Sequence, residues 1–121
     1  MMTSDASYLY DLFKMQCEFF KKSLTDKGLR RDKIDRYSYS SWAIKDTIDA
    51  IDSWDGMVSV GVIRGILRDQ MSMYDRYYNT NPDKQMRYKH ALNAVCYLYK
   101  LTEGYVYDEY QGYYEQSCEW G

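Results

Sequence analysis

The single histidine, His90, is the first candidate for acid–base or metal chemistry in this sequence of 121 residues. Zinc sites combine histidine with thiolate or carboxylate ligands, and helical neighbours stand three or four residues apart. The positions at those distances hold Met86, Arg87, Asn93 and Ala94, none of which is a thiol or a carboxylate. We therefore predict no metal site, and expect His90 to be a surface or boundary residue of a helix.

The three cysteines, Cys17, Cys96 and Cys118, lie far apart and form no CxxC motif. Their odd number and spacing favour free thiols in a reducing compartment over a disulfide framework. Cys96 lies in an apolar run and is expected in the core. The sequence contains no GxSxG, Walker, GxGxxG or HExxH motif. It therefore predicts a protein that is not an enzyme and holds no cofactor.

Aspartates recur every three residues at Asp46, Asp49, Asp52 and Asp55. Three residues turn a helix by about 300°, so the row winds slowly around one polar side. The spacing differs from that of a calcium loop, whose ligands alternate along the chain. A solvated acidic face is the favoured interpretation. If the row has a function, we expect Asp46, Asp49 and Asp52 to dock a basic partner.

Basic residues are concentrated between positions 21 and 36, and none follows Lys100. Tyr37, Tyr39 and Trp42 come directly after this segment, so contact with phosphates and stacking on bases are one interpretation. Nucleic-acid readers usually carry net positive charge, whereas this chain has a net charge of -2. Nucleic-acid binding is therefore the alternative prediction. Its candidate residues are Lys27, Arg30, Arg31, Lys33 and Arg36.

The C-terminal residues combine acidic side chains with tyrosine, of which the chain has 15. Such a surface can stand in for the phosphates and bases of nucleic acid and compete for the arginine-lined channel of a nuclease or polymerase. The alternative is a helix whose tyrosine rings cover the bundle. The candidate partner-binding residues are Tyr107, Asp108, Glu109, Tyr110, Tyr113, Tyr114 and Glu115.

Helical periodicity accounts for the first half of the chain. An apolar stripe predicts a first helix from the N-cap Ser4 to Gly28. Phe19 and Met15 widen its apolar face, so we expect contacts on more than one side. Residues 29–39 are predicted as a loop or a short exposed helix. A second helix is expected from an N-cap at Ser40 or Ser41 to residues 55–56.

Residues 57–63 fit either a strand or a helix, because Val58, Val60 and Val62 alternate. The longer helical pattern favours a third helix over about 59–78. Asn81 and Pro82 predict the start of a fourth helix that runs to about Thr102. A short helix is expected in the tail, residues 105–121.

Together these patterns predict an all-α fold: a compact bundle of four main helices plus a short C-terminal helix or tail. We expect one domain spanning residues 1–121, cytoplasmic, with no membrane-spanning segment. In size and character, though through no motif, the chain resembles small phage and mobile-element proteins, including anti-CRISPR proteins. The predicted function is non-enzymatic protein binding, as a stoichiometric inhibitor of a host protein such as a nucleic-acid-binding enzyme. Homodimerisation is left open.

Overall fold

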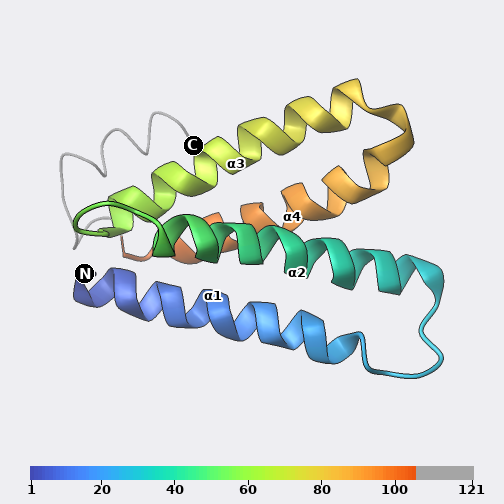
Figure 1. Ribbon diagram of the computed structural model, residues 1–121, viewed down its shortest axis with the longest axis horizontal. Coiled ribbons are helices and arrows are strands. Elements are labelled where there is room, and N and C mark those ends of the chain that lie inside the picture. The colour runs from blue at the N-terminus through green and yellow to red at the C-terminus, as the bar shows by residue number, and fades with distance from the viewer. Residues whose placement is uncertain (106–121) are drawn as a thin grey trace.

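Four long helices make up the part of the chain that this computed structural model describes, residues 1–105. They are α1 (Ser4–Ser23), α2 (Arg31–Asp52), α3 (Val60–Thr80) and α4 (Gln85–Thr102), and a 3-10 turn, η1 (Pro82–Lys84), leads into α4 (Figure 1). The predicted all-α fold with four main helices is confirmed. The predicted tail helix lies outside the described residues. None of the four helices has the length and hydropathy that crossing a membrane requires.

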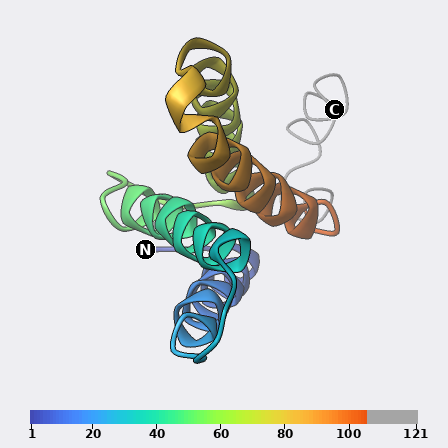
Figure 2. The same ribbon diagram turned by 90° about the vertical axis from the view of Figure 1, so that its right-hand side faces the viewer.

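The helices follow one another in space in the order α1, α2, α4, α3 (Figure 2). The main packing contacts join α1 to α2, α2 to α4, and α4 to α3. α1 therefore has one principal neighbour, and it touches α4 only slightly. Within residues 1–105, this order leaves part of the surface of α1 without a helical partner.

One core runs through all four helices, and most of its side chains come from the predicted apolar stripes. A parallel β-bridge between Met2 and Val58 ties the N-terminus to the connection before α3. In it Thr3 N donates to Val58 O at 3.0 Å and Val58 N donates to Met1 O at 2.9 Å. Fully buried core side chains include Leu9, Phe13, Ile44, Ile63, Leu67, Val95 and Leu98.

The predicted ends of the first helix are wrong by a few residues. Thr3, rather than Ser4, is the N-cap, and its Oγ1 accepts a hydrogen bond from Ala6 N at 3.3 Å. The helix ends at Ser23, with Leu24 as a right-handed C-cap. Gly28 does have a positive φ of 88°, but it lies in the connecting loop. Glycine is therefore needed for the turn between helices and does not end α1.

The predicted start of the second helix is also wrong, because α2 begins at Arg31 rather than at Ser40 or Ser41. Arg31 pairs with Asp35 at 3.2 Å, one turn further on, which supports the first turns of the helix. Ser40 and Ser41 are buried inside α2, where small side chains permit close packing. Burial, rather than capping, therefore explains why serine stands there.

The helical interpretation of the third segment is confirmed. Ser59 is the N-cap of α3, and its Oγ accepts a hydrogen bond from Val62 N at 3.2 Å. Of the three alternating valines, only Val58, which precedes the helix, has a strand-like pairing. The boundary predicted at Asn81 and Pro82 is confirmed, but Pro82 begins a 3-10 turn and α4 itself starts three residues later, at Gln85.

Candidate functional site

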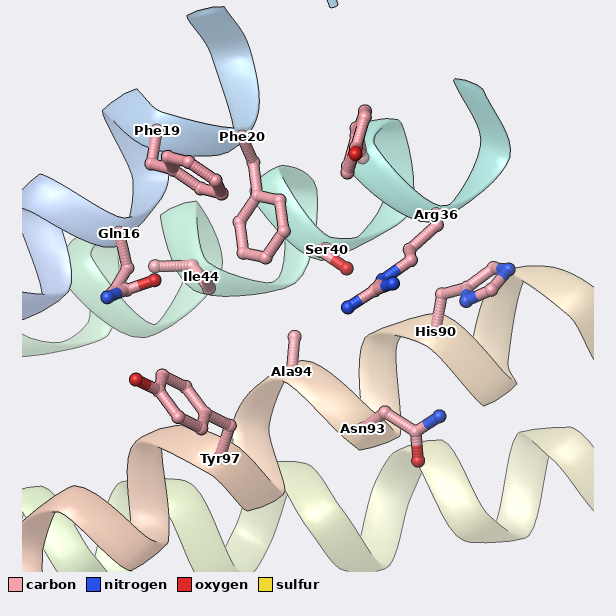
Figure 3. A pocket seen from close by; sticks show the side chains of 11 residues that line it. Gln16, Phe19, Phe20, Arg36, Ser40, Ile44, His90, Asn93, Ala94 and Tyr97 are labelled. Atoms are coloured by element: carbon pink, nitrogen blue, oxygen red, sulfur yellow. The ribbon is translucent and has the colours of Figure 1, made fainter. Parts of the chain in front are cut away.

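A groove of about 610 Å³ lies where α1 and α4 both pack on α2, and we call it the α1–α4 groove. The volume falls within the range of roughly 300–1,000 Å³ that is common for ligand pockets. α1 and α4 form its two sides, and α2 lies between them (Figure 3). Its lining residues are Gln16, Phe19, Phe20, Arg36, Tyr37, Ser40, Ile44, His90, Asn93, Ala94 and Tyr97.

The inner part of the groove is apolar. Ile44 is fully buried, Ala94 and Ser40 are nearly so, and the side chain of Phe20 lies above them (Figure 3). Phe20 is fixed by ring contacts with Phe19 at 5.5 Å and with Tyr37 at 5.9 Å between centroids. The groove therefore has a preformed apolar floor and one aromatic wall.

The outer rim of the groove is aromatic and solvent-exposed. Phe19 is 59% exposed and Tyr97 is 47% exposed, although both belong to helices whose other faces are buried. Phe19 also borders a second hollow on α1, together with Lys14, Met15, Glu18 and Lys22. Exposed apolar surface that continues beyond a cavity is typical of a protein-binding site.

Among residues 1–105, the one charged side chain that lines the groove belongs to Arg36, at one end of it. The Arg36 side chain reaches from α2 toward α4 on the side where His90 lies (Figure 3). Among residues 1–105, Arg36 forms no salt bridge. No aspartate or glutamate is among the described residues that line the groove. This end is thus basic in a chain whose net charge is -2.

His90 contributes a polar atom without a partner. Its Nε2 is buried and has no hydrogen bond in the described structure. Burial lowers the pKa of His90, the positive charges of Lys89 and Arg36 lower it further, and the Asp35 carboxylate opposes them in part. The imidazole is therefore neutral at pH 7, where it can offer one donor and one acceptor. The half-buried position of His90 within α4 fits the expectation of a surface or boundary residue on a helix.

The acidic residues of α2 point in different directions and are engaged within the protein. Asp46 accepts a hydrogen bond from Tyr74 of α3 at 3.4 Å, and burial raises the pKa of its carboxyl group. Asp49 pairs with Lys45 at 2.8 Å. Asp52 accepts from Tyr10 of α1 at 2.6 Å, which raises the pKa of Tyr10 to about 12.

Asp46, Asp49 and Asp52 therefore do not form one shared cluster. This agrees with the slow winding of the row around the helix, which turns successive side chains apart. No group of three potential metal ligands occurs within residues 1–105. Docking of a basic partner on this row stays a prediction.

The five basic residues that were candidates for phosphate contact have different surroundings. Arg30 pairs with Asp32 at 3.3 Å, and Arg31 pairs with Asp35. Lys27 lies in the loop before α2, and Lys33 is half-buried. Arg36 alone reaches the groove.

The tail candidates, Tyr107, Asp108, Glu109, Tyr110, Tyr113, Tyr114 and Glu115, lie outside the described residues. Their predicted role in partner binding is therefore not addressed by the described fold.

The two cysteines of the described chain are held in packed surroundings. The Cys17 thiol donates to Ser41 O at 3.7 Å, and Cys96 Sγ lies 3.5 Å from Met71 Sδ. Burial raises the pKa of both thiols, so they are protonated and weakly nucleophilic at neutral pH. Packing, rather than chemistry, accounts for both residues.

Sequence reasoning missed the groove although one signal for it was present. Phe19 and Met15 lie off the main apolar stripe of α1, which predicted contacts on a second side. The local sequence does not indicate that Tyr97 or Asn93 lines a groove, because this depends on α4 facing α1 across α2.

Comparisons with protein-family models, with curated proteins and with solved structures find no match for this chain.

Proposed function

We propose that this protein is a non-enzymatic binding protein that recognises another protein through the α1–α4 groove. One observation carries the proposal: a preformed apolar groove of about 610 Å³ is bordered by the exposed rings of Phe19 and Tyr97. Exposed aromatic side chains beside a pocket are the usual anchors of protein interfaces. Burying them on association removes apolar surface from water.

The inner part of the groove is well suited to association because little order must be gained there on binding. Phe20 is already fixed between Phe19 and Tyr37, and Ile44 is part of the core. A preorganised surface loses less conformational entropy when a partner binds. The groove therefore supports specific recognition on a small domain.

Stoichiometric inhibition of a host protein is the form of this function that we propose. An inhibitor needs to occupy a surface of its target and needs no chemistry of its own. The acidic, tyrosine-containing tail would add electrostatic attraction toward a nucleic-acid-binding enzyme. Nucleic-acid binding by this chain itself is less favoured, because Arg30 and Arg31 already pair with aspartates.

A comparative capture experiment tests the proposed function. Tagged wild-type protein, F19S and M57S are used to capture proteins from cells that naturally express the chain. Met57, 52% exposed in the α2–α3 connection, is the matched control for Phe19, which is 59% exposed. We expect one protein to be retained by wild type and M57S and lost by F19S, because Phe19 borders the groove and Met57 does not.

Both substitutions change exposed side chains, so the unfolding free energy should shift by only about 0.5 kcal/mol. Thermal unfolding of each variant checks this. A partner retained equally by all three proteins would place recognition elsewhere, and retention of no partner by wild type would contradict the proposed function.

A further inference from the structure

The charge of the α1–α4 groove differs from that of the whole chain. Among the described residues that line it, Arg36 is the one charged side chain and it is basic, whereas the chain carries a net charge of -2. In the adjoining hollow Lys14 and Lys22 accompany a single acid, Glu18, which pairs with Lys21 at 3.8 Å. The complementary partner therefore carries negative charge beside apolar side chains.

We infer that the groove binds an acidic amphipathic helix of a partner protein, with a carboxylate on Arg36 and apolar side chains over Phe20, Ile44 and Ala94. This inference rests on the proposed function and specifies the chemistry of the partner. The planar guanidinium of Arg36 can form two parallel hydrogen bonds with one carboxylate. His90 adds a neutral polar group at the same end.

The extent of the apolar surface favours a protein segment over a small ligand. A small ligand is largely enclosed by its pocket, whereas here the rim residues Phe19 and Tyr97 remain about half exposed. The surface continues from Phe19 to Met15, one helical turn away along α1. An amphipathic helix presents apolar side chains three or four residues apart, so one can enter the groove while the next covers Met15.

Selection from a library of helical peptides tests this inference without knowledge of the natural partner. The library is displayed on phage and selected in parallel on full-length wild type, R36E, K27E and F19S. K27E makes the same charge change in the loop between α1 and α2, and Lys27 does not line the groove. We expect wild type and K27E to enrich peptides with Asp or Glu beside two apolar residues spaced by three or four.

The R36E selection should lose this acidic preference and gain Lys or Arg at the same position. The best acidic peptide should bind R36E at least about tenfold more weakly than wild type, as expected when a charge-assisted hydrogen bond is lost. R36Q, which keeps hydrogen-bonding capacity without the charge, should show an intermediate loss. Circular dichroism and thermal unfolding verify that each variant is folded.

Several outcomes would overturn the inference. They are equal enrichment of acidic peptides on wild type and R36E, enrichment of uncharged peptides, or a selection in which F19S behaves as wild type.

Concentration-dependent dimerisation of wild type, lost in F19S, would assign the groove to a second copy. Low-salt binding of single-stranded DNA, lost in R36E, would assign it to nucleic acid. A capture experiment that depends on Phe19, together with non-acidic selected peptides, would preserve the proposed function and refute only this chemistry.

Discussion

Buried polar side chains join α2 to α3 through a short hydrogen-bonded network. Thr47 is fully buried, and its hydroxyl lies 2.6 Å from Gln70 Oε1, to which it donates. Gln70 Nε2 lies 3.4 Å from Ala43 O and 3.5 Å from Tyr74 OH. Tyr74 OH in turn reaches Asp46. Because a buried polar group without a partner is costly, this network fixes how α2 faces α3.

Removing one member of this network should lower the free energy of unfolding more than removing both partners of one hydrogen bond. T47V leaves Gln70 Oε1 buried without its donor, and we expect a loss of roughly 1–3 kcal/mol in the free energy of unfolding. The double variant T47V/Q70L replaces both groups with apolar ones and should recover most of that loss. Urea unfolding of wild type, both single variants and the double variant measures the coupling. Additive losses would contradict the network.

At the scale of elements, α2 is the helix on which the site depends. It supplies Arg36, Tyr37, Ser40 and Ile44 to the groove, and α1 and α4 both pack on it. A loop over residues 29–39 would leave Arg36 and Tyr37 unpositioned. The helical start at Arg31 therefore places Arg36 and Tyr37 in the groove, between α1 and α4.

Proline substitution distinguishes a helix from a loop over this segment. Arg31 is the first helical residue, and Arg30 before it is extended with φ -73° and ψ 159°, so R31P should be tolerated. Arg36 lies inside the helix, where R36P should cost at least ~3 kcal/mol. R36A controls for loss of the side chain. Chemical unfolding of the three variants provides the comparison, and equal tolerance of both prolines would argue for a loop.

For the whole molecule, the spatial order α1, α2, α4, α3 determines where apolar side chains stay exposed among residues 1–105. A more closed bundle would cover the free face of α1 with α4, but these two helices touch only slightly. α1 also buries the fewest side chains of the four helices, namely Ala6, Leu9, Phe13 and Cys17. The exposed Phe19 and the groove beside it follow from this arrangement.

Hydrogen exchange should reveal the weaker attachment of α1. Segments with few buried contacts open locally at lower free energy than the core. We expect central amides of α1 to exchange at least about tenfold faster than those of α4, a difference of ~1.4 kcal/mol in opening free energy. Exchange measured by mass spectrometry at peptide resolution tests this. Equal protection of the two helices would contradict it.

The sequence by itself determined the helical class, the four main helices and most of the core. Apolar spacing is a local property, so the stripes containing Leu9, Ile44 and Leu98 could be read directly. The boundary at Asn81 and Pro82 was equally readable, because proline and its preceding residue act on their own backbone. Local signals failed where packing overrides them, as at Ser40 and Ser41, which resemble caps but are buried within α2.

Only the tertiary structure decided where the site lies. Phe19 belongs to α1, Arg36 to α2, and His90 and Tyr97 to α4, so no local spacing rule connects all four. Their meeting depends on α1 and α4 packing on the same helix without closing on each other. That outcome is a balance among many interhelical contacts rather than a property of any one segment. The groove, and the position of Arg36 at one end of it, follow from this packing.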